Sequence, residues 1–214
     1  MLIDLKNLKE KNSSIKALAY QLYENNGVLK REQVSEYLKD LGQNERKILR
    51  DLGVKFGRYH VFLYRLIKPE AVLLRTQLWK NYHQKYFELK IPTFGLNFID
   101  NKIFKNKNFM LLCGFEKFEN VFVRIDILER LFVQIINSNP DENKDIKMIP
   151  EMLNLLGCNK NNFKSLLQNM GYKVSEKNNE IFFKYFPTRK RNKKIDKKGS
   201  KESPFGILKN LNLN

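Results

Sequence analysis

Two parts of the sequence predict the same order of secondary-structure elements, and this repeated order limits the fold more than any other feature. In the first part, Ser13 or Ser14 can cap a helix over about residues 13–25 that ends at Asn26-Gly27. A short extended stretch at 28–29 and helices over about 31–40 and 45–52 follow. Residues 54–62 alternate and are β-rich around a glycine, which predicts a hairpin.

The second part repeats this order. A helix is predicted over about 126–137, then a short extended stretch at 148–149, and then a helix from Pro150 to Gly157. Asn159 can cap a further helix that ends at Gly171, and strands at 172–174 and 181–183 flank a polar turn. Helix, short strand, helix, helix and two-stranded hairpin is the order of a winged helix. The sequence therefore predicts two winged-helix-like units.

The predicted fold class is mainly α with small β sheets (α+β). The first unit and a following helix over about 69–84 occupy 1–86, a helical and loop connector occupies 87–120, and the second unit occupies 121–186. Within the connector, 90–108 is predicted to be a loop and 109–113 a strand. Residues 187–214 hold nine basic and two acidic residues and lose apolar periodicity, which predicts a flexible, disordered basic tail.

Charge points to a polyanionic partner. The chain has 40 Lys and Arg residues against 23 Asp and Glu, a net charge of +17 and a pI near 9.8. A field of this size attracts nucleic acids, although a ribosomal, membrane-surface or simply soluble protein is also compatible with it. The two cysteines lie far apart in apolar contexts, as buried thiols of a reducing compartment do. With no apolar run near the ~18 residues of a membrane span and no signal-peptide pattern, we expect a cytoplasmic protein without a membrane partner.

Motifs for catalysis are missing from the sequence. It has no phosphate-binding G-x-x-x-x-G-K-[ST] loop and no acidic partner motif, so the chain has no route to ATP hydrolysis of its own. His60 and His83 are isolated, and Cys113 and Cys158 have no C-x-x-C partner. We therefore expect no metal, no cofactor and no enzymatic activity from this chain alone.

The predicted functional residues are basic. In a winged helix the third helix and the hairpin commonly face the nucleic acid. We expect the first unit to present Arg46, Lys47, Arg50, Lys55 and Arg58, with Tyr59 able to stack on a base, and the second unit to present Lys160, Lys164, Lys173 and Lys177. The tail adds Arg189, Lys190, Arg191, Lys193 and Lys194, which need only mobile positive charge to contact phosphates. Lysines on exposed helices are also ordinary solvated residues, and winged helices also dock proteins.

A family resemblance covers nearly the whole chain. Residues 52–63, followed by Leu66-Ile67-Lys68-Pro69, resemble the region behind the motor domains of alphaproteobacterial ATP-dependent helicases, a superfamily 2 group related to the mitochondrial degradosome RNA helicase. The resemblance continues through Trp79, 123–131, 156–158, 170–172 and Ser203-Pro204-Phe205; Tyr64-Arg65 departs from the expected Pro and small residue. Both motor domains are missing from this chain. The resemblance therefore implies ATP and Mg only where a motor is supplied elsewhere.

The leading hypothesis is a nucleic-acid-binding accessory region of a helicase, which holds single-stranded RNA or DNA through phosphate contacts. Its partners would be RNA or DNA, together with helicase motor domains or a degradosome-like protein. Two alternatives remain: a free-standing winged-helix DNA-binding protein, and a protein-docking scaffold whose basic tail is incidental. The sequence does not distinguish RNA from DNA.

Overall fold

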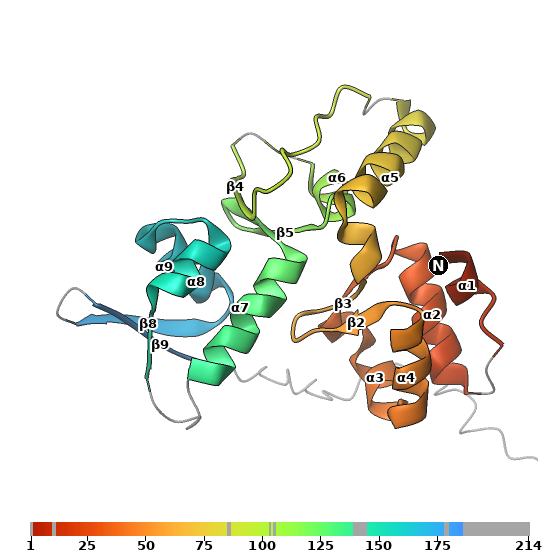
Figure 1. The fold of residues 1–214 in the computed structure, drawn as a ribbon, viewed down its shortest axis with the longest axis horizontal. Coiled ribbons are helices and arrows are strands. Elements are labelled where there is room, and N and C mark those ends of the chain that lie inside the picture. Colours follow the sequence, from red (N-terminus) through yellow and green to blue (C-terminus); the bar gives the residue numbers. More distant parts are fainter. Residues whose placement is uncertain are drawn as a thin grey trace, which may run out of the picture.

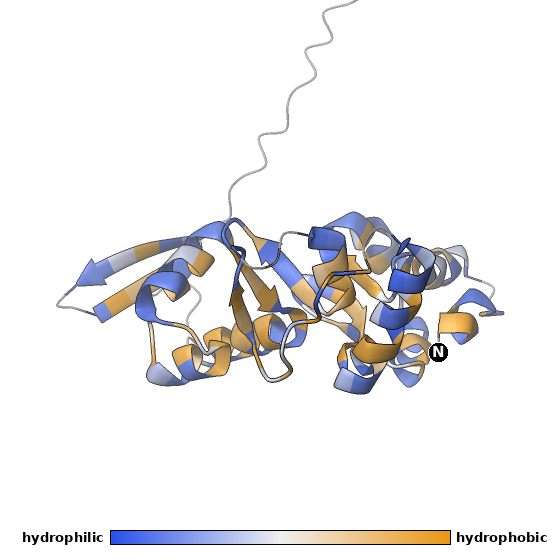
Figure 2. Cartoon of the chain, turned by 90° about the horizontal axis from the view of Figure 1, so that it is seen from above, coloured by the Kyte–Doolittle hydropathy of each residue, from blue (hydrophilic) through white to orange (hydrophobic). Residues whose placement is uncertain are grey.

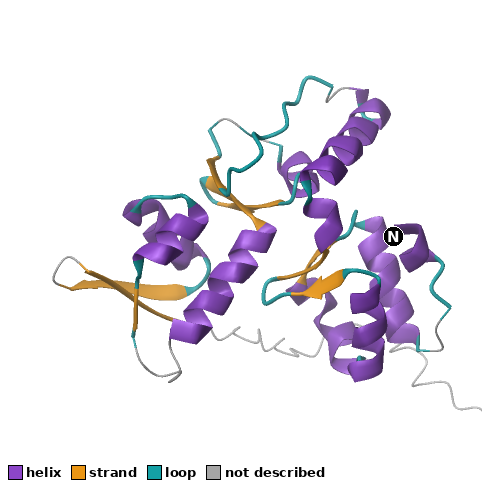
Figure 3. Ribbon diagram, in the orientation of Figure 1, coloured by secondary structure: helices purple, strands orange, loops and turns teal. Residues whose placement is uncertain are grey.

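The computed structural model describes residues 2–9, 12–84, 87–102, 104, 106–138, 145–177 and 180–185. Over these residues the chain is a mixture of helices and strands, and the strands form small three-stranded antiparallel sheets (Figures 1 and 3). Each sheet has the same order, with its third strand between the first and the second. The fold therefore contains the same β arrangement three times along the chain.

The first unit follows the predicted order. Its helices are α1 (Leu2–Lys6), α2 (Ser13–Glu24), α3 (Ser35–Asp40) and α4 (Gln43–Asp51), with the 3-10 turn η1 (Arg31–Val34) before α3. Its strands are β1 (Val28–Lys30), β2 (Val54–Phe56) and β3 (His60–Leu63), so the predicted hairpin and short strand are confirmed. The predicted serine cap of α2 is wrong, because Asn12 caps the helix by accepting a hydrogen bond from the Ser14 backbone N–H.

The middle of the chain, where the sequence predicted a helical and loop connector, forms a three-stranded sheet of its own, and we call residues 69–124 the middle unit. After the 3-10 turn η2 (Tyr64–Ile67) come α5 (Pro69–Tyr82), β4 (Phe98–Asp100), α6 (Lys107–Leu112), β5 (Phe115–Phe118) and β6 (Val121–Arg124). The predicted strand at 109–113 is wrong, because most of it belongs to α6, which Asn106 caps through the Phe109 backbone N–H. Part of the predicted loop at 90–108 is strand β4, which pairs with β6.

The third unit, which the sequence predicted as the second, follows its predicted order, but its short strand lies at 146–147 and the predicted position at 148–149 is wrong. It contains α7 (Ile125–Ser138), β7 (Ile146–Lys147), α8 (Pro150–Leu156), α9 (Lys160–Asn169), β8 (Tyr172–Lys177) and β9 (Glu180–Tyr185). Pro150 stands in the first turn of α8, Gly157 ends that helix in the left-handed conformation, and Asn159 caps α9 through the Asn162 N–H.

One glycine turn marks all three units. Gly53, Gly114 and Gly171 each stand between a helix and the second strand of a sheet, with φ of 89°, 88° and 87°. The N–H of each donates to a carbonyl three residues earlier, at 2.8, 2.9 and 3.0 Å. A side chain is disfavoured at such a φ, so glycine is the residue suited to this turn. Lys55, Glu116 and Lys173 are the second residues after these glycines and hence occupy equivalent positions.

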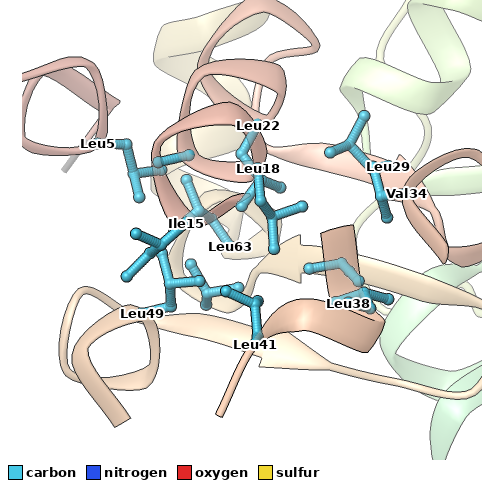
Figure 4. Packing of buried hydrophobic residues seen from close by; sticks show 13 residues of the cluster. Leu5, Ile15, Leu18, Leu22, Leu29, Val34, Leu38, Leu41, Leu49 and Leu63 are labelled. Atoms are coloured by element: carbon cyan, nitrogen blue, oxygen red, sulfur yellow. The ribbon is translucent and has the colours of Figure 1, made fainter. Parts of the chain in front are cut away.

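Each unit has its own hydrophobic cluster. The cluster of the first unit groups Ile15, Leu18 and Leu22 of α2 with Leu49 of α4 and Leu63 of β3, all fully buried (Figure 4). Most helices carry both hydrophobic and hydrophilic residues, as expected for helices that cover a core with one face (Figure 2). Helix α7 lies centrally, between the third unit's other elements and the β2–β3 hairpin of the first unit, and β8 and β9 project from the end of the molecule opposite to α1 (Figure 1).

Candidate nucleic-acid interface

Helix α4 presents part of the predicted basic surface. Lys47 and Arg50 are exposed one turn apart, and Lys55 is exposed on the adjoining strand β2. The Arg50 guanidinium lies 5.8 Å from the ring centre of Phe56, which connects the helix face to the strand. These three residues therefore remain available to an anionic ligand.

Arg46 has a structural contact that the sequence did not reveal. Its guanidinium donates to the backbone oxygens of Leu38, at 2.7 Å, and Leu41, at 3.1 Å. These carbonyls lie at the C-terminal end of α3, where helices leave acceptors without partners. Arg46 therefore joins α4 to α3, and its predicted contact with phosphate would compete with this role.

Helix α9 presents the corresponding surface of the third unit. Its buried residues are Phe163, Leu166 and Leu167, and its ten residues include no acidic side chain. Lys160 is exposed at its first turn, and half-buried Lys164 forms an ion pair of 3.3 Å with Glu176. The outward face is completed by short polar residues, which are Asn161, Ser165 and Gln168.

The β8–β9 hairpin carries further lysines. Tyr172 is buried in the core beside α9, so the next residue, Lys173, points to the opposite side of the sheet. Lys173 is exposed and stands directly opposite Lys184 in the ladder. Like charges in this position repel each other. Lys177, near the hairpin end, lies 4.0 Å from Asp145 and is therefore partly neutralised. We name Lys160, Lys164, Lys173 and Lys184 together the α9–hairpin surface, which covers the outer side of α9 and the side of the sheet turned away from it.

Tyr59 does not lie on an open face. Its ring packs edge-on against Phe132 of α7, at 5.7 Å, and its hydroxyl lies 3.3 Å from the hydroxyl of Tyr172. Burial, with the neighbouring Tyr172, raises the pKa of the Tyr59 hydroxyl. Arg58 keeps an exposed side chain, with its guanidinium 5.6 Å from the Phe132 ring centre. The predicted stacking of Tyr59 on a base would require it to leave these contacts.

The turn that carries Arg58 and Tyr59 joins the first unit to the third. Glu129 of α7 accepts hydrogen bonds from the backbone N–H groups of Arg58, of Tyr59 at 2.9 Å and of His60 at 2.8 Å. A side chain on Gly57 would collide with the Glu129 carboxylate, so glycine permits the approach. Sequence reasoning missed Glu129, because its partners are about 70 positions away.

His60 connects this turn to the middle unit. Its imidazole lies 3.3 Å from Glu116 and 3.4 Å from Glu129, and Lys30 pairs with the other oxygen of Glu116 at 2.7 Å. Burial lowers the pKa of His60, but the two carboxylates outweigh burial and raise it above its ordinary value. Burial raises the pKa of Glu116, but His60 and Lys30 outweigh that effect and lower it. We call Lys30, His60, Glu116 and Glu129 the junction.

The described part of the chain was also searched for metal sites, reactive cysteines and membrane-spanning helices. No group of three or more His, Cys, Asp or Glu residues is placed there to hold a metal ion. Cys113 and Cys158 are free, and burial raises their pKa to about 12 and about 11, so both are thiols at neutral pH. Among the described helices, none combines the length and apolar character needed to cross a membrane.

The five predicted tail residues, Arg189, Lys190, Arg191, Lys193 and Lys194, lie outside the described residues, and their role stays a prediction.

Comparison of the chain with protein-family models, with curated proteins and with solved structures finds no match.

Proposed function

We propose that the chain is a nucleic-acid-binding region that holds single-stranded RNA or DNA mainly through phosphate contacts. The observation that best supports this proposal is that equivalent positions of the three units differ in charge and in exposure. Lys55 and Lys173 are exposed in the first and third units, whereas Glu116 is buried in the junction of the middle unit. The outer units thus offer positive charge to a ligand, and the middle unit uses the same position to join them.

Each unit, in this proposal, is a winged helix. The outer units have the order helix, strand, helix, helix, strand, strand, whereas the described residues of the middle unit form one helix, α6, between its first two strands. In this fold the third helix and the hairpin commonly contact nucleic acid. That arrangement gives Lys47, Arg50 and Lys55 in the first unit and the α9–hairpin surface in the third a common role.

The helicase connection rests on the sequence resemblance, which places this chain behind a motor domain that would supply ATP hydrolysis. Phosphate contacts suit an accessory region, because a strand leaving a motor must be held whatever its sequence. The test is fluorescence anisotropy with single-stranded RNA, single-stranded DNA and duplex DNA across a salt series. Affinity that falls steeply with salt and depends little on sequence supports the proposal; affinity that salt does not change would contradict it.

One observation favours protein docking as a second function. Leu74, Leu78 and Tyr82 follow one another at four-residue spacing on α5 and are 63, 60 and 84% exposed. Apolar residues at this spacing form a stripe that another helix can cover. Replacing Leu74 and Leu78 with serine should weaken capture of a motor domain if this is its contact face, and should leave binding of single strands unchanged.

A further inference from the structure

A small pocket opens among η2, the start of α5, residues 91–96 and the start of α7. Its volume is about 220 Å³, below the roughly 300–1,000 Å³ of pockets that enclose whole small-molecule ligands, so it suits one or two side chains of a peptide. We propose that the pocket binds an apolar segment of the same chain, Ser203-Pro204-Phe205-Gly206-Ile207-Leu208. Docking of this segment is independent of nucleic-acid binding.

The pocket is lined by buried and by exposed apolar side chains. Ile67 and Val72 are buried, at 7 and 2% exposure. Tyr64, Phe94 and Leu96 line the pocket too and are 37, 47 and 46% exposed, and we call these three the rim. Exposed apolar residues are ordinarily scattered singly, whereas those that gather around one concave surface are typical of an interaction site.

Its shape distinguishes the pocket from other exposed apolar positions among the described residues. Leu74 and Leu78 lie along α5, and Val133 and Ile136 along α7. The outer surface of a helix is convex, so it contacts a partner side chain from one side only. An aromatic anchor binds best where a pocket surrounds it and excludes water. The pocket is therefore better suited than either helix to a short segment with a single aromatic ring.

The proposed occupant differs in composition from the residues that precede it. Residues 187–202 hold eight basic and two acidic side chains, whereas 203–208 hold no charged side chain. Phe205 is the only aromatic residue in 187–214. Pro204 fixes one backbone angle next to it, which lowers the entropy lost on binding. The segment thus offers one aromatic anchor with an uncharged, mostly apolar neighbourhood.

The described part of the chain ends close to the pocket. Tyr185, its last residue, pairs with Tyr172, whose hydroxyl lies 3.3 Å from that of Tyr59. The Tyr59 ring packs on Phe132 of α7, and Asp126, which lines the pocket, is about 9 Å from Phe132 along the helix axis. The 17 residues that connect Tyr185 to the segment can span up to about 60 Å. The segment therefore reaches the pocket within one chain.

A tether makes a small pocket sufficient for docking. Two sites joined by a short connection in one chain meet at an effective concentration on the order of mM, so a contact of modest intrinsic affinity is occupied. Docking would anchor the basic residues at 189–194 on both sides, at Tyr185 and at the pocket. Their positive charge would then stay beside the folded units.

The test joins the pocket to the segment by a disulfide in the full chain. Thr93→Cys at the pocket and Ser203→Cys in the segment leave Phe205 and the rim unchanged, and Thr93 is exposed. Burial raises the pKa of the natural thiols of Cys113 and Cys158 to about 12 and about 11, so they compete little. The chain is equilibrated in glutathione buffers, and intact mass gives the fraction with a disulfide within one chain. This fraction yields the effective concentration of the two cysteines.

The matched control pairs Asn137→Cys with Ser203→Cys. Asn137 is exposed on α7, about as far along the helix from Phe132 as Asp126 is, so the tether alone treats the two pairs alike. The effective concentration of the pocket pair should exceed that of the control about tenfold or more, and Phe205→Ser should remove the excess. Equal values for the two pairs, or no effect of Phe205→Ser, would overturn the proposal. Disulfides that form only between chains would assign the pocket to a second copy instead.

Substitutions in the folded part identify the docking site. Phe94→Ser with Leu96→Ser alters only exposed residues of the rim and should lower the effective concentration of the pocket pair as Phe205→Ser does. Val133→Ser with Ile136→Ser, at 55 and 52% exposure on α7, should leave it unchanged. The opposite pattern would place the segment on α7 and overturn the pocket. All these measurements are made without nucleic acid, so their outcome is separate from that of the proposed function.

Discussion

The His60 imidazole lies 3.3 Å from the carboxylate of Glu116, and both side chains are almost fully buried. His60 belongs to the first unit, Glu116 to the middle unit, and Glu129, on the other side of the ring, to the third. A small apolar cluster that includes Phe62 and Ile125 packs beside them. One histidine thus contacts acidic residues of both other units.

Glu129 should be the most sensitive residue of the junction. Glu129→Ala would leave three backbone N–H groups without their acceptor and would remove one of the two carboxylates beside buried His60, so we expect the free energy of unfolding to fall by about 3–5 kcal/mol. Urea denaturation measures this directly. The matched control is Glu119→Ala in the exposed β5–β6 turn, which should stay within about 0.5 kcal/mol of the unchanged chain. Equal effects of the two substitutions would contradict the account of the junction.

Stability should depend on pH through His60 and Glu116. Because folding raises the pKa of His60, its contribution is fully present below its ordinary pKa of 6.5 and is lost as pH rises through the raised value. Folding lowers the pKa of Glu116, so its contribution is present above 4.5 and is lost as pH falls through the lowered value. Glu129 and Lys30 are the other charged groups at these two residues.

His60→Gln should therefore flatten the alkaline side of the stability curve. Urea unfolding from about pH 5.5 to about pH 9 would show the unchanged chain losing stability with rising pH, and the variant losing less of it. Parallel curves for the two proteins would show that His60 is not the titrating group.

Arg46 and Lys47 are neighbours with opposite expected roles. Arg46→Ala removes the donors to Leu38 and Leu41, and should cost about 1–3 kcal/mol in urea denaturation. Lys47→Ala removes an exposed charge, and should leave stability unchanged while it weakens nucleic-acid binding. A stable Arg46→Ala variant would show that the two hydrogen bonds contribute little.

Charge reversal tests the α9–hairpin surface. Lys160→Glu with Lys173→Glu should weaken binding of single strands and reduce the slope of log affinity against log salt by about one for each phosphate that the variant no longer neutralises. Lys16→Glu with Lys39→Glu makes the same change of net charge on exposed positions of the first unit, outside the predicted interface. Equally weakened binding in the two double variants would mean that total charge, and not this surface, determines affinity.

Local signals made the outer units predictable. Local signals such as Asn159, Gly157, Pro150 and the turn glycines Gly53 and Gly171 act on their own turn, so their positions define element ends without knowledge of the fold. The middle unit was missed because Phe109 to Cys113 is a short apolar run, which periodicity alone does not assign to helix or strand. Its signal was present in Cys113-Gly114-Phe115, which matches Leu52-Gly53-Val54 and Met170-Gly171-Tyr172.

Contacts between residues far apart in the chain could not be predicted from the sequence. His60 reads as an isolated histidine, and only the packing of three units brings two carboxylates to it. Arg46 and Tyr59 look like surface residues in a basic segment, yet each has backbone or ring partners in the fold. Residue type predicted which side chains can contact phosphate, whereas the fold decides which of them remain accessible.

The most direct measurement is the affinity for single-stranded RNA and DNA, across a salt series, of the full chain and of the chain ending at Phe186. Removing the tail takes away nine basic and two acidic residues, so we expect a weaker affinity and a smaller salt dependence. We expect the shortened chain still to bind nucleic acid, because the folded units carry the interface, and to bind single strands better than duplex. If removal of the tail abolishes the affinity completely, this expectation is contradicted, and the positive charge of the tail acts only as a nonspecific tether.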